Sequence, residues 1–221
     1  MKSCSAYIFL LLIIFLLFFT NKNIVGGNNQ TLDKSTFDKL YSEWPEGANG
    51  EEEEEDVAPT YGKMEYEGLV KLVKHLNINK KDTFLDCGSG IGNVVAFFGM
   101  NTDVKKATGV EIIKSRHKSA VRLIKKLKTN KCNFKNKNIN NIDFNDSTII
   151  FTCSTCFSEN LMNLINKKCE SNKNLKYLIS QKSIDNTKLK YLGSVDIKTS
   201  WNDSTTHHIY TNRKDMKMIK T

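Results

Sequence analysis

One stretch of the sequence decides the fold, and it reads FLDCGSGIGNVV at residues 84–95. Phe84 and Leu85 begin an apolar run that ends at Asp86, three glycines follow at alternate positions, and an apolar segment resumes after Asn93. This order predicts a buried strand, a glycine turn and the start of a helix. Glycine permits positive φ and lets a ligand approach the amides at a helix start. The stretch therefore predicts the first βα unit of a nucleotide-binding sheet.

The spacing of the glycines indicates which ligand they serve. A dinucleotide turn is spaced G-x-G-x-x-G, so Gly92 falls one residue early for a pyrophosphate, which disfavours a nicotinamide dehydrogenase. Asp86-x-Gly88-x-Gly90-x-Gly92 instead resembles motif I of class I S-adenosylmethionine (AdoMet) methyltransferases. A plain tight turn is the alternative interpretation of the glycines alone.

A second acid supports the nucleotide interpretation. Twenty-five residues after Asp86, the run Ala107-Thr108-Gly109-Val110-Glu111 is typical of the next strand, and it ends in Glu111. A carboxylate at the end of that strand can accept hydrogen bonds from both hydroxyls of a ribose. The two features together predict a cofactor that contains adenosine.

The length and net charge of the chain limit the number of domains and the partners to expect. A chain of 221 residues with 39% apolar residues can bury one good core, so we expect one domain and a tail, and a monomer. The net charge of +9 would permit binding to nucleic acid or an acidic surface. Lysine is, however, mixed with asparagine, as in residues 131–141, and the basic side chains of the helix expected at 114–129 are most simply its solvated face. Docking of an acidic partner on that helix is the alternative.

The cysteines and histidines predict no metal site. Six cysteines lack the density of a disulfide scaffold, and Cys153-x-x-Cys156 has no second pair to complete four zinc ligands. A redox pair is the alternative for these two thiols. His207 and His208 are adjacent on an expected strand, so their side chains should point to opposite faces.

Four segments are expected along the chain. Residues 1–22 contain the apolar run 7–19 behind Lys2, which predicts a signal peptide or an uncleaved membrane anchor. Residues 23–58 form an acidic linker, in which Phe37, Leu40, Tyr41 and Trp44 have helical spacing and could dock on the domain. Residues 59–214 form the folded domain, and 215–221 are a tail.

Apolar periodicity predicts the remaining elements of the domain. We expect helices at 69–76, 93–98, 114–129 and 158–169, and strands at 84–86, 107–111, 134–139, 148–152, 175–180, 191–197 and 205–211. The alternation of strands and helices, with a final hairpin-like pair, favours an α/β fold. Its architecture should be the Rossmann-like, seven-stranded class I methyltransferase sheet, with helices on both faces and the last strand antiparallel.

Several pieces in order resemble one family, the disruptor-of-telomeric-silencing (Dot-type) lysine methyltransferases, which are histone-lysine enzymes without a SET domain. The pieces are Tyr61-Gly62, residues 84–93, Gly109-Val110-Glu111, Asp143-Phe144, residues 150–157, Trp201 and Ile209-Tyr210. They extend over most of the chain from Tyr61 to Arg213. The chain looks in particular like the small, single-domain relatives in protists and bacteria.

The resemblance implies a role for each matching residue. Tyr61 and Gly62 would belong to the loop that closes over AdoMet, and Glu111 would bind the ribose. Asp143 and Phe144 would bind adenine. The methionine end would be held by Asp86, Gly88, Ser89 and Gly90, with Gly92 and Asn93 beside them. Ser154, Thr155 and Phe157, with Tyr61, would lie beside the transferred methyl group, and Ser154 would also contact AdoMet.

The resemblance implies transfer of a methyl group from AdoMet to a lysine of a protein substrate, which is the expected partner. A histone is the acceptor that the family suggests, and a nucleosome or nucleic acid is a less supported partner. Two departures from the family pattern weaken histone specificity, because Lys63 replaces an acid in the closing loop and Ser154 replaces an asparagine. A methyltransferase for small molecules or other proteins, and a membrane-tethered AdoMet-binding pseudoenzyme, are the alternatives. The apolar N-terminus predicts membrane association or the secretory pathway, whereas a histone enzyme would be nuclear.

Overall fold

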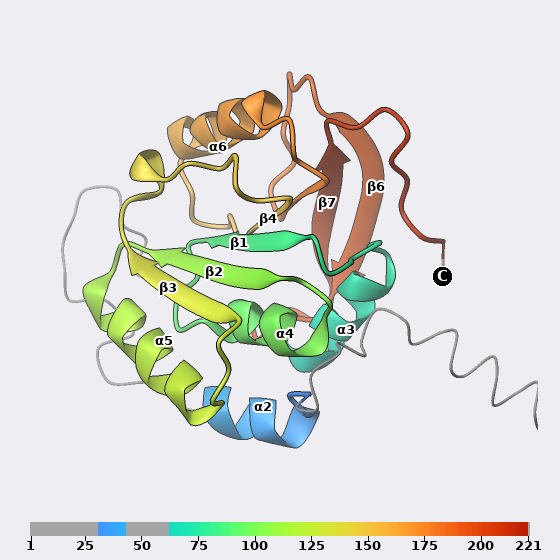
Figure 1. Cartoon of the computed structure of the whole chain (residues 1–221). Helices are drawn as coiled ribbons and strands as arrows, with labels where there is room; N and C mark the ends of the chain where they lie inside the picture. Colours follow the sequence, from blue (N-terminus) through green and yellow to red (C-terminus); the bar gives the residue numbers. More distant parts are fainter. Residues whose placement is uncertain (1–30, 43–61, 221) are drawn as a thin grey trace, which may run out of the picture.

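The computed structural model describes residues 31–42 and 62–220 (Figure 1). The helices are α2 (Lys34–Tyr41), α3 (Tyr66–Lys74), α4 (Asn93–Asn101), α5 (Lys114–Lys126) and α6 (Glu159–Ser171), with the short 3-10 helix η1 (Ile139–Asn141). The strands are β1 (Thr83–Cys87), β2 (Lys106–Glu111), β3 (Cys132–Asn136), β4 (Ile149–Thr152), β5 (Tyr177–Ser180), β6 (Lys190–Ile197) and β7 (Thr205–Thr211).

The seven strands form one sheet in the order β3-β2-β1-β4-β5-β7-β6. The first five are parallel where they pair, and β7 runs antiparallel to both β5 and β6. α6 covers one face, while α3, α4 and α5 cover the other (Figure 1). The predicted fold class is therefore confirmed.

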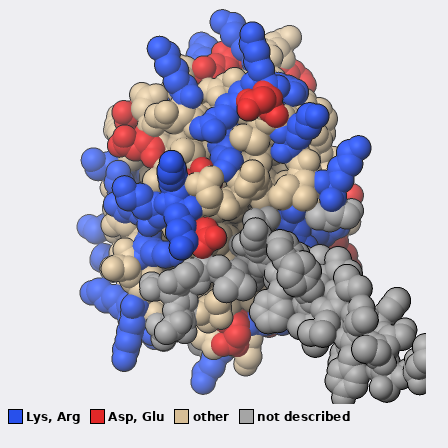
Figure 2. All heavy atoms as spheres, turned by 45° about the vertical axis from the view of Figure 1, so that its right-hand side comes forward, with Lys and Arg blue, Asp and Glu red and all other residues tan. Residues whose placement is uncertain are grey.

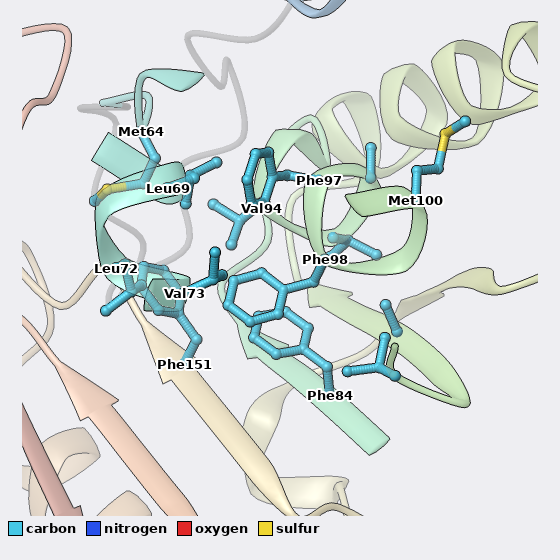
Figure 3. Packing of buried hydrophobic residues seen from close by; sticks show 14 of the residues in the cluster. Met64, Leu69, Leu72, Val73, Phe84, Val94, Phe97, Phe98, Met100 and Phe151 are labelled. Carbon is cyan, nitrogen blue, oxygen red and sulfur yellow. The ribbon is translucent and has the colours of Figure 1, made fainter. Parts of the chain in front are cut away.

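Alternation along the strands builds two hydrophobic cores. On β1, Phe84 packs with the helices α3 and α4, whereas Leu85 and Cys87 pack on the α6 side. The first core is aromatic, and the rings of Phe84 and Phe98 stack with centroids 3.9 Å apart (Figure 3). Residues alternate in this way because successive strand side chains point to opposite faces.

A buried ion pair fastens the amino ends of three strands. Lys176 Nζ lies 2.7 Å from Asp82 Oδ2, and both side chains are only 5% exposed. The other carboxylate oxygen of Asp82 accepts a hydrogen bond of 3.0 Å from Thr148 Oγ1. These residues precede β5, β1 and β4 respectively, so the pair fixes the start of the central strands, opposite the edge that carries the glycine turn.

The helix α2 lies within the predicted linker and packs on the domain. Asp33 caps it by accepting a hydrogen bond of 2.9 Å from Thr36 N. Phe37 and Tyr41 are buried, and the ring of Phe37 contacts those of Tyr66 and Phe97. The helical spacing of Phe37 and Tyr41 is thus explained by docking, while Trp44 lies outside the described residues.

The predicted signal segment, residues 1–22, also lies outside the described residues. Within residues 31–42 and 62–220, none of the helices has both the length and the apolar character that a membrane span requires. The predicted tail returns to the domain, where Ile219 N donates to His75 O at 3.0 Å and Met216 and Met218 pack against the first core.

Candidate cofactor site

The glycine turn lies at the carboxyl edge of the sheet, between β1 and α4. Gly88, Gly90 and Gly92 have φ values of 84°, 52° and 86°, a region that residues with a side chain rarely adopt. Gly88 N and Ser89 N both donate to Val110 O at 2.9 Å, which ties the turn to β2. The three glycines are therefore required by the backbone itself.

Glu111 joins this turn to the start of α5. Its Oε2 accepts a hydrogen bond of 2.8 Å from Gly90 N, and its Oε1 accepts one of 2.9 Å from Ile113 N. Burial raises the pKa of Glu111, while the two amide hydrogen bonds and the charge of Arg116 lower it. Each oxygen keeps a further lone pair, so the carboxylate can accept hydroxyl groups of a ligand without releasing the turn.

Two buried polar atoms beside the turn have no hydrogen-bond partner among the described residues, namely Asp86 Oδ1 and Ser89 Oγ. Burial and the nearby Glu111 raise the pKa of Asp86 well above its ordinary value. Buried polar groups in proteins nearly always have a partner. The unpaired oxygen atoms therefore fit a ligand that brings hydrogen-bond donors, such as the ammonium group of a bound amino acid.

The loop after the undescribed Tyr61 is fixed at both ends. Gly62 packs against the ring of Trp201, and Lys63 N donates to Ser200 Oγ at 3.0 Å. Asn93 Nδ2 donates to Met64 O at 2.9 Å. Asn93, predicted as a cofactor contact, thus holds this loop against the start of α4.

Lys63, which departs from the family pattern, serves the helix α2. Its ammonium group donates to Tyr41 O and to Ser42 O, where the last carbonyls of α2 lack helical partners. Burial lowers the pKa of Lys63. The side chain therefore connects the loop beside the candidate site to α2.

The segment after β4 is divided between buried and exposed residues. Ser154 is fully buried, accepts a hydrogen bond of 2.9 Å from Lys182 N, and lies 3.3 Å from Ser180 Oγ. Thr155 is exposed and donates to Gln181 Oε1. Ser154 is thus buried and held inside a network of hydrogen bonds with Lys182 N and Ser180 Oγ.

Phe157 does reach the glycine turn. A Cβ built on Gly88 would lie 2.8 Å from Phe157 Cζ, so the ring lies directly over the turn. The half-buried Phe157 is further fixed by Lys182 Nζ, which donates to its carbonyl at 2.6 Å. The structure therefore places one predicted residue of the post-β4 segment beside the predicted cofactor residues.

Asp143 and Phe144 do not join this group. Phe144 is buried in the second core beneath α6, and its carbonyl accepts hydrogen bonds from Ser147 N and from Asn172 Nδ2, at the opposite edge of the sheet. Asp143 is exposed and accepts a hydrogen bond from Asn145 N. The sequence thus grouped Asp143 and Phe144 with the cofactor residues, whereas the structure holds their backbone at the amino ends of the strands.

Sequence analysis missed Asn136, which ends β3 at the carboxyl edge. Its Nδ2 donates to Glu111 O and to Ile112 O, both at 2.8 Å. Lys137 N also donates to Glu111 O, at 3.2 Å. The available signal was the register, because Asn136 lies opposite Glu111 in the parallel pair of β2 and β3.

The described residues contain no group of three or more His, Cys, Asp or Glu that could hold a metal ion. Burial raises the pKa of the Cys153 thiol to about 12, which keeps it protonated and unreactive at neutral pH. His207 is buried, whereas His208 is partly exposed, so the two rings lie on different faces.

The chain matches the family model described as "Histone methylation protein DOT1" over residues 53–216. Two curated relatives are described as "Histone-lysine N-methyltransferase, H3 lysine-79 specific". The one from Drosophila melanogaster is 39% identical over 51 residues, which are 23% of this chain and 3% of the relative. The one from Caenorhabditis elegans is 38% identical over 56 residues, 25% of this chain and 6% of the relative. The match thus spans a small part of each relative.

Solved structures show a likeness of fold. MtNAS in complex with MTA and tNA superposes with a TM-score of 0.54 at 12% identity, over 67% of this chain and 61% of that one. An RNA methyltransferase from Salinibacter ruber, in complex with S-adenosyl-L-homocysteine, gives a TM-score of 0.48 at 15% identity over 74% and 100%. The superposition on MtNAS, at 12% identity, indicates a shared fold alone.

Proposed function

This chain belongs to the family described as histone methylation protein DOT1, and from this premise we propose that it transfers a methyl group from AdoMet to a lysine of a protein, with a histone as the leading acceptor. The matched residues contain the whole sheet and the glycine turn. The observation that carries the proposal is a pair of buried acids beside that turn: Asp86 on β1 just before it, and Glu111 at the end of β2, which accepts a hydrogen bond from Gly90 N within it.

The residues at the carboxyl edge fit the two ends of AdoMet. Asp86 Oδ1 and Ser89 Oγ would accept or share hydrogen bonds with the ammonium and carboxylate groups, and Glu111 would accept the ribose hydroxyls. When bound, AdoMet would supply a methyl group on a sulfonium for an in-line displacement, in which the acceptor nitrogen bonds to the methyl carbon and the sulfur leaves as a neutral thioether. The chain's own residues would hold the acceptor nitrogen about 3 to 3.5 Å from the methyl carbon, in a channel that excludes water.

Aromatic side chains would prepare the acceptor. A lysine amine attacks only after its ammonium has lost a proton, and an apolar wall lowers the pKa of an amine by desolvating the charged form. Phe157 over the glycine turn and Trp201 against Gly62 supply such walls. The released proton would pass to water, since none of the described side chains beside Phe157 is placed as a general base.

A binding module without turnover is the second candidate. It is favoured by the burial of Ser154, whose hydroxyl points into the protein where the family pattern has an asparagine. An enzyme for small molecules is a third candidate within the same chemistry. All three share the AdoMet site, so cofactor binding alone does not separate them.

Labelled AdoMet separates the candidates. The full chain would be incubated with nucleosomes, with free histones and with extract of its own cells, beside Glu111→Gln and the exposed control Asp146→Asn. We expect labelled protein from the parent and the control, and none from Glu111→Gln. Tight AdoMet binding without any labelled protein or small molecule would favour the module.

We further propose that residues 1–22 decide where the protein acts, with a membrane as the first site and the nucleus as the alternative that a histone acceptor requires. Imaging of the tagged chain, beside one that lacks residues 1–22, tests this. Nuclear signal from the full chain would contradict the membrane assignment.

A further inference from the structure

A further buried polar atom, away from the glycine turn, has no hydrogen-bond partner among the described residues. It is Nε2 of His207, on β7. The side chain is 0% exposed, and its ring stacks on that of Phe151 with centroids 5.8 Å apart. Buried polar groups in proteins nearly always have a partner. The unpaired Nε2 therefore fits a ligand that brings a hydrogen-bond donor.

The other ring nitrogen fixes the tautomer of His207. Nδ1 lies 3.0 Å from Thr205 O, a carbonyl that can only accept, so Nδ1 carries the hydrogen. In the neutral ring, Nε2 is then an acceptor with a free lone pair. Burial lowers the pKa of His207 to about 4, so the ring is neutral at pH 7. His207 thus presents one hydrogen-bond acceptor without a charge.

His207 lies at the same edge of the sheet as the candidate cofactor site. β7 runs antiparallel to β5, so the start of β7 lies beside the end of β5 at the carboxyl edge. Ser180 pairs with His208, which brings His207 beside Gln181, the residue that follows β5. Gln181 Oε1 in turn accepts a hydrogen bond of 3.5 Å from Cys153 Sγ, just after β4. Cys153, Gln181 and His207 therefore form a row along this edge.

His207 also faces the same side of the sheet as Asp86. Phe151, on whose ring His207 stacks, belongs to the first core and pairs with Asp86 in the register of β1 and β4 (Figure 3). Asp86 alternates with Leu85 and Cys87, which face the second core. β4 and β5 separate β7 from β1. Asp86 and His207 therefore lie on opposite sides of Phe151, and the side of His207 is the one that the candidate cofactor residues leave to an acceptor.

The side chains of this row are uncharged at neutral pH. Basic side chains cover much of the surface, as Figure 2 shows for one face, but none belongs to the row. The Gln181 amide does not titrate, and burial raises the pKa of the Cys153 thiol to about 12. The nearby carboxylate of Asp196 lies on the opposite face of the sheet, where it accepts a hydrogen bond of 2.7 Å from Thr206 Oγ1. A donor at His207 Nε2 therefore meets an acceptor without charge.

We propose that His207 Nε2 accepts a hydrogen bond from the acceptor nitrogen and so orients its lone pair for methyl transfer. This role rests on the proposed function and assigns it a residue that binds the acceptor. A carboxylate at this place would stabilise the ammonium form of an amine, whereas an uncharged acceptor holds the amine without raising its pKa. The class of acceptor that fits is an amine with at least one N–H.

His207 orients the amine but takes no proton from it. In the transfer, the nitrogen lone pair forms the bond to the methyl carbon, and the bond from that carbon to sulfur breaks with its electron pair on sulfur. The methylated nitrogen is then an ammonium, which loses its proton to water. An imidazole with a pKa of about 4 is too weak a base to keep that proton, because an alkyl ammonium has a pKa of about 10.

Nitrogen NMR of the histidine rings tests this contact without turnover. The full chain, saturated with S-adenosylhomocysteine, would be titrated with n-butylamine, which matches the end of a lysine side chain. We expect the Nε2 resonance of His207 to move upfield, as a donated hydrogen bond moves an unprotonated ring nitrogen. n-Butyltrimethylammonium, which has no N–H, should leave it in place. An equal response to both probes would overturn the proposal, and so would no response to the amine, since Nε2 would then be paired with water or unpaired.

The variant His207→Phe removes the acceptor atom but keeps an aromatic ring against Phe151. Its affinity for n-butylamine, read from backbone amide shifts, should fall about three- to tenfold, because one neutral hydrogen bond is lost. Its AdoMet affinity by calorimetry should stay within about twofold of the parent. His207→Gln, whose amide oxygen can accept in place of Nε2, should restore part of the amine affinity. His208→Phe, on the other face of β7, is the matched control and should resemble the parent.

The two proposals fail in different ways. A full chain that binds neither AdoMet nor S-adenosylhomocysteine would overturn the cofactor site and the role of His207 together. A chain that binds both, but whose His207 does not respond to n-butylamine, would overturn the role of His207 alone. If His207→Phe also lost AdoMet binding, the variant would be misfolded, and the titration of the parent would decide.

Discussion

At the residue scale, Asp86 occupies a place where its own charge is unfavourable. The carboxyl group is 2% exposed, its Oδ1 has no partner among the described residues, and burial together with Glu111 raises its pKa. A buried carboxyl group without a hydrogen-bond partner contributes little to the stability of the fold at neutral pH. The burial of this carboxyl group is explained if a ligand supplies the missing hydrogen-bond donor.

Asp86→Asn should therefore separate stability from binding. We expect the free energy of unfolding at pH 7 to stay equal or rise, because a buried charge is removed. AdoMet affinity should fall about 10- to 100-fold, since a hydrogen bond to a charged group contributes about 1.5 to 3 kcal/mol. Calorimetric titration and chemical denaturation measure the two quantities, and Asp146→Asn is the exposed control. Unchanged affinity in Asp86→Asn would remove this residue from the site.

His207 should make the stability of the fold depend on pH. It is fully buried against the ring of Phe151, and burial lowers its pKa to about 4. The unfolded chain, with a histidine pKa of about 6.5, binds more protons than the folded one between about pH 6.5 and 4. His207 therefore contributes a loss of about 3 kcal/mol of unfolding free energy as pH falls through that window.

The variant His207→Gln isolates this contribution, because its amide can still donate to Thr205 O, as His207 Nδ1 does. Asp86 and Glu111 have raised pKa values and act in the opposite direction, since protonation relieves their buried charge as pH falls. Urea denaturation between pH 7 and 4.5 should show a smaller loss in His207→Gln than in the parent. His208→Gln should resemble the parent, and equal pH dependence in all three would contradict the assignment.

At the element scale, the sequence predicted the sheet well and the site in part. β7 begins and ends at the predicted residues, and Leu69, Leu72, Val73 and Leu76 are all fully buried as their spacing requires. Local patterns succeed here because burial follows the period of a strand or helix. They cannot say which edge of the sheet a connection follows, which is why Asp143 and Phe144 were grouped with residues at the opposite edge.

Ser154 shows a second limit of sequence reasoning. Its position after β4 was predicted, but its burial depends on hydrogen bonds to Lys182 N and Ser180 Oγ, more than 25 residues away. The same holds for Asn136, whose partners lie on another strand. Polar pairing across the chain sets the direction of these side chains, and no local period records it.

The helix α2 should be part of the cooperative fold although it lies outside the residues matched to the family. Phe37 is buried among Tyr41, Tyr66 and Phe97, and Asn101 exchanges two hydrogen bonds with the backbone of Leu32. Phe37→Ala should lower the unfolding free energy by about 3 to 5 kcal/mol. Chemical denaturation followed by circular dichroism measures this loss.

Lys39→Ala, an exposed change on the same helix, is the control and should stay within about 0.5 kcal/mol of the parent. Because Lys63 joins the loop beside the candidate site to the end of α2, Phe37→Ala should also weaken AdoMet binding. If Phe37→Ala were as stable as the parent, α2 would not be part of the cooperative fold.

At the scale of the whole molecule, the candidate site joins elements from distant parts of the chain. Asp86 lies on β1 and Glu111 is the last residue of β2. The loop at Gly62 is held by Asn93 on α4 and by Trp201, which follows β6. A ligand that satisfies Asp86 and Glu111 therefore bridges segments whose separation is a necessary step of unfolding. Binding at this site should stabilise the molecule as a unit.

AdoMet at one hundred times its Kd should raise the unfolding free energy by about 2.7 kcal/mol. For a domain of this size, each kcal/mol shifts Tm by about 2 to 4 °C, so an increase of about 5 to 10 °C is expected. NAD at the same concentration should give no shift, because the glycine spacing does not suit a pyrophosphate. Glu111→Gln should give a smaller shift than the parent. A Tm that moves equally with NAD and AdoMet would contradict a site built for a sulfonium nucleoside, since the glycine turn would then recognise only the adenosine that both molecules share.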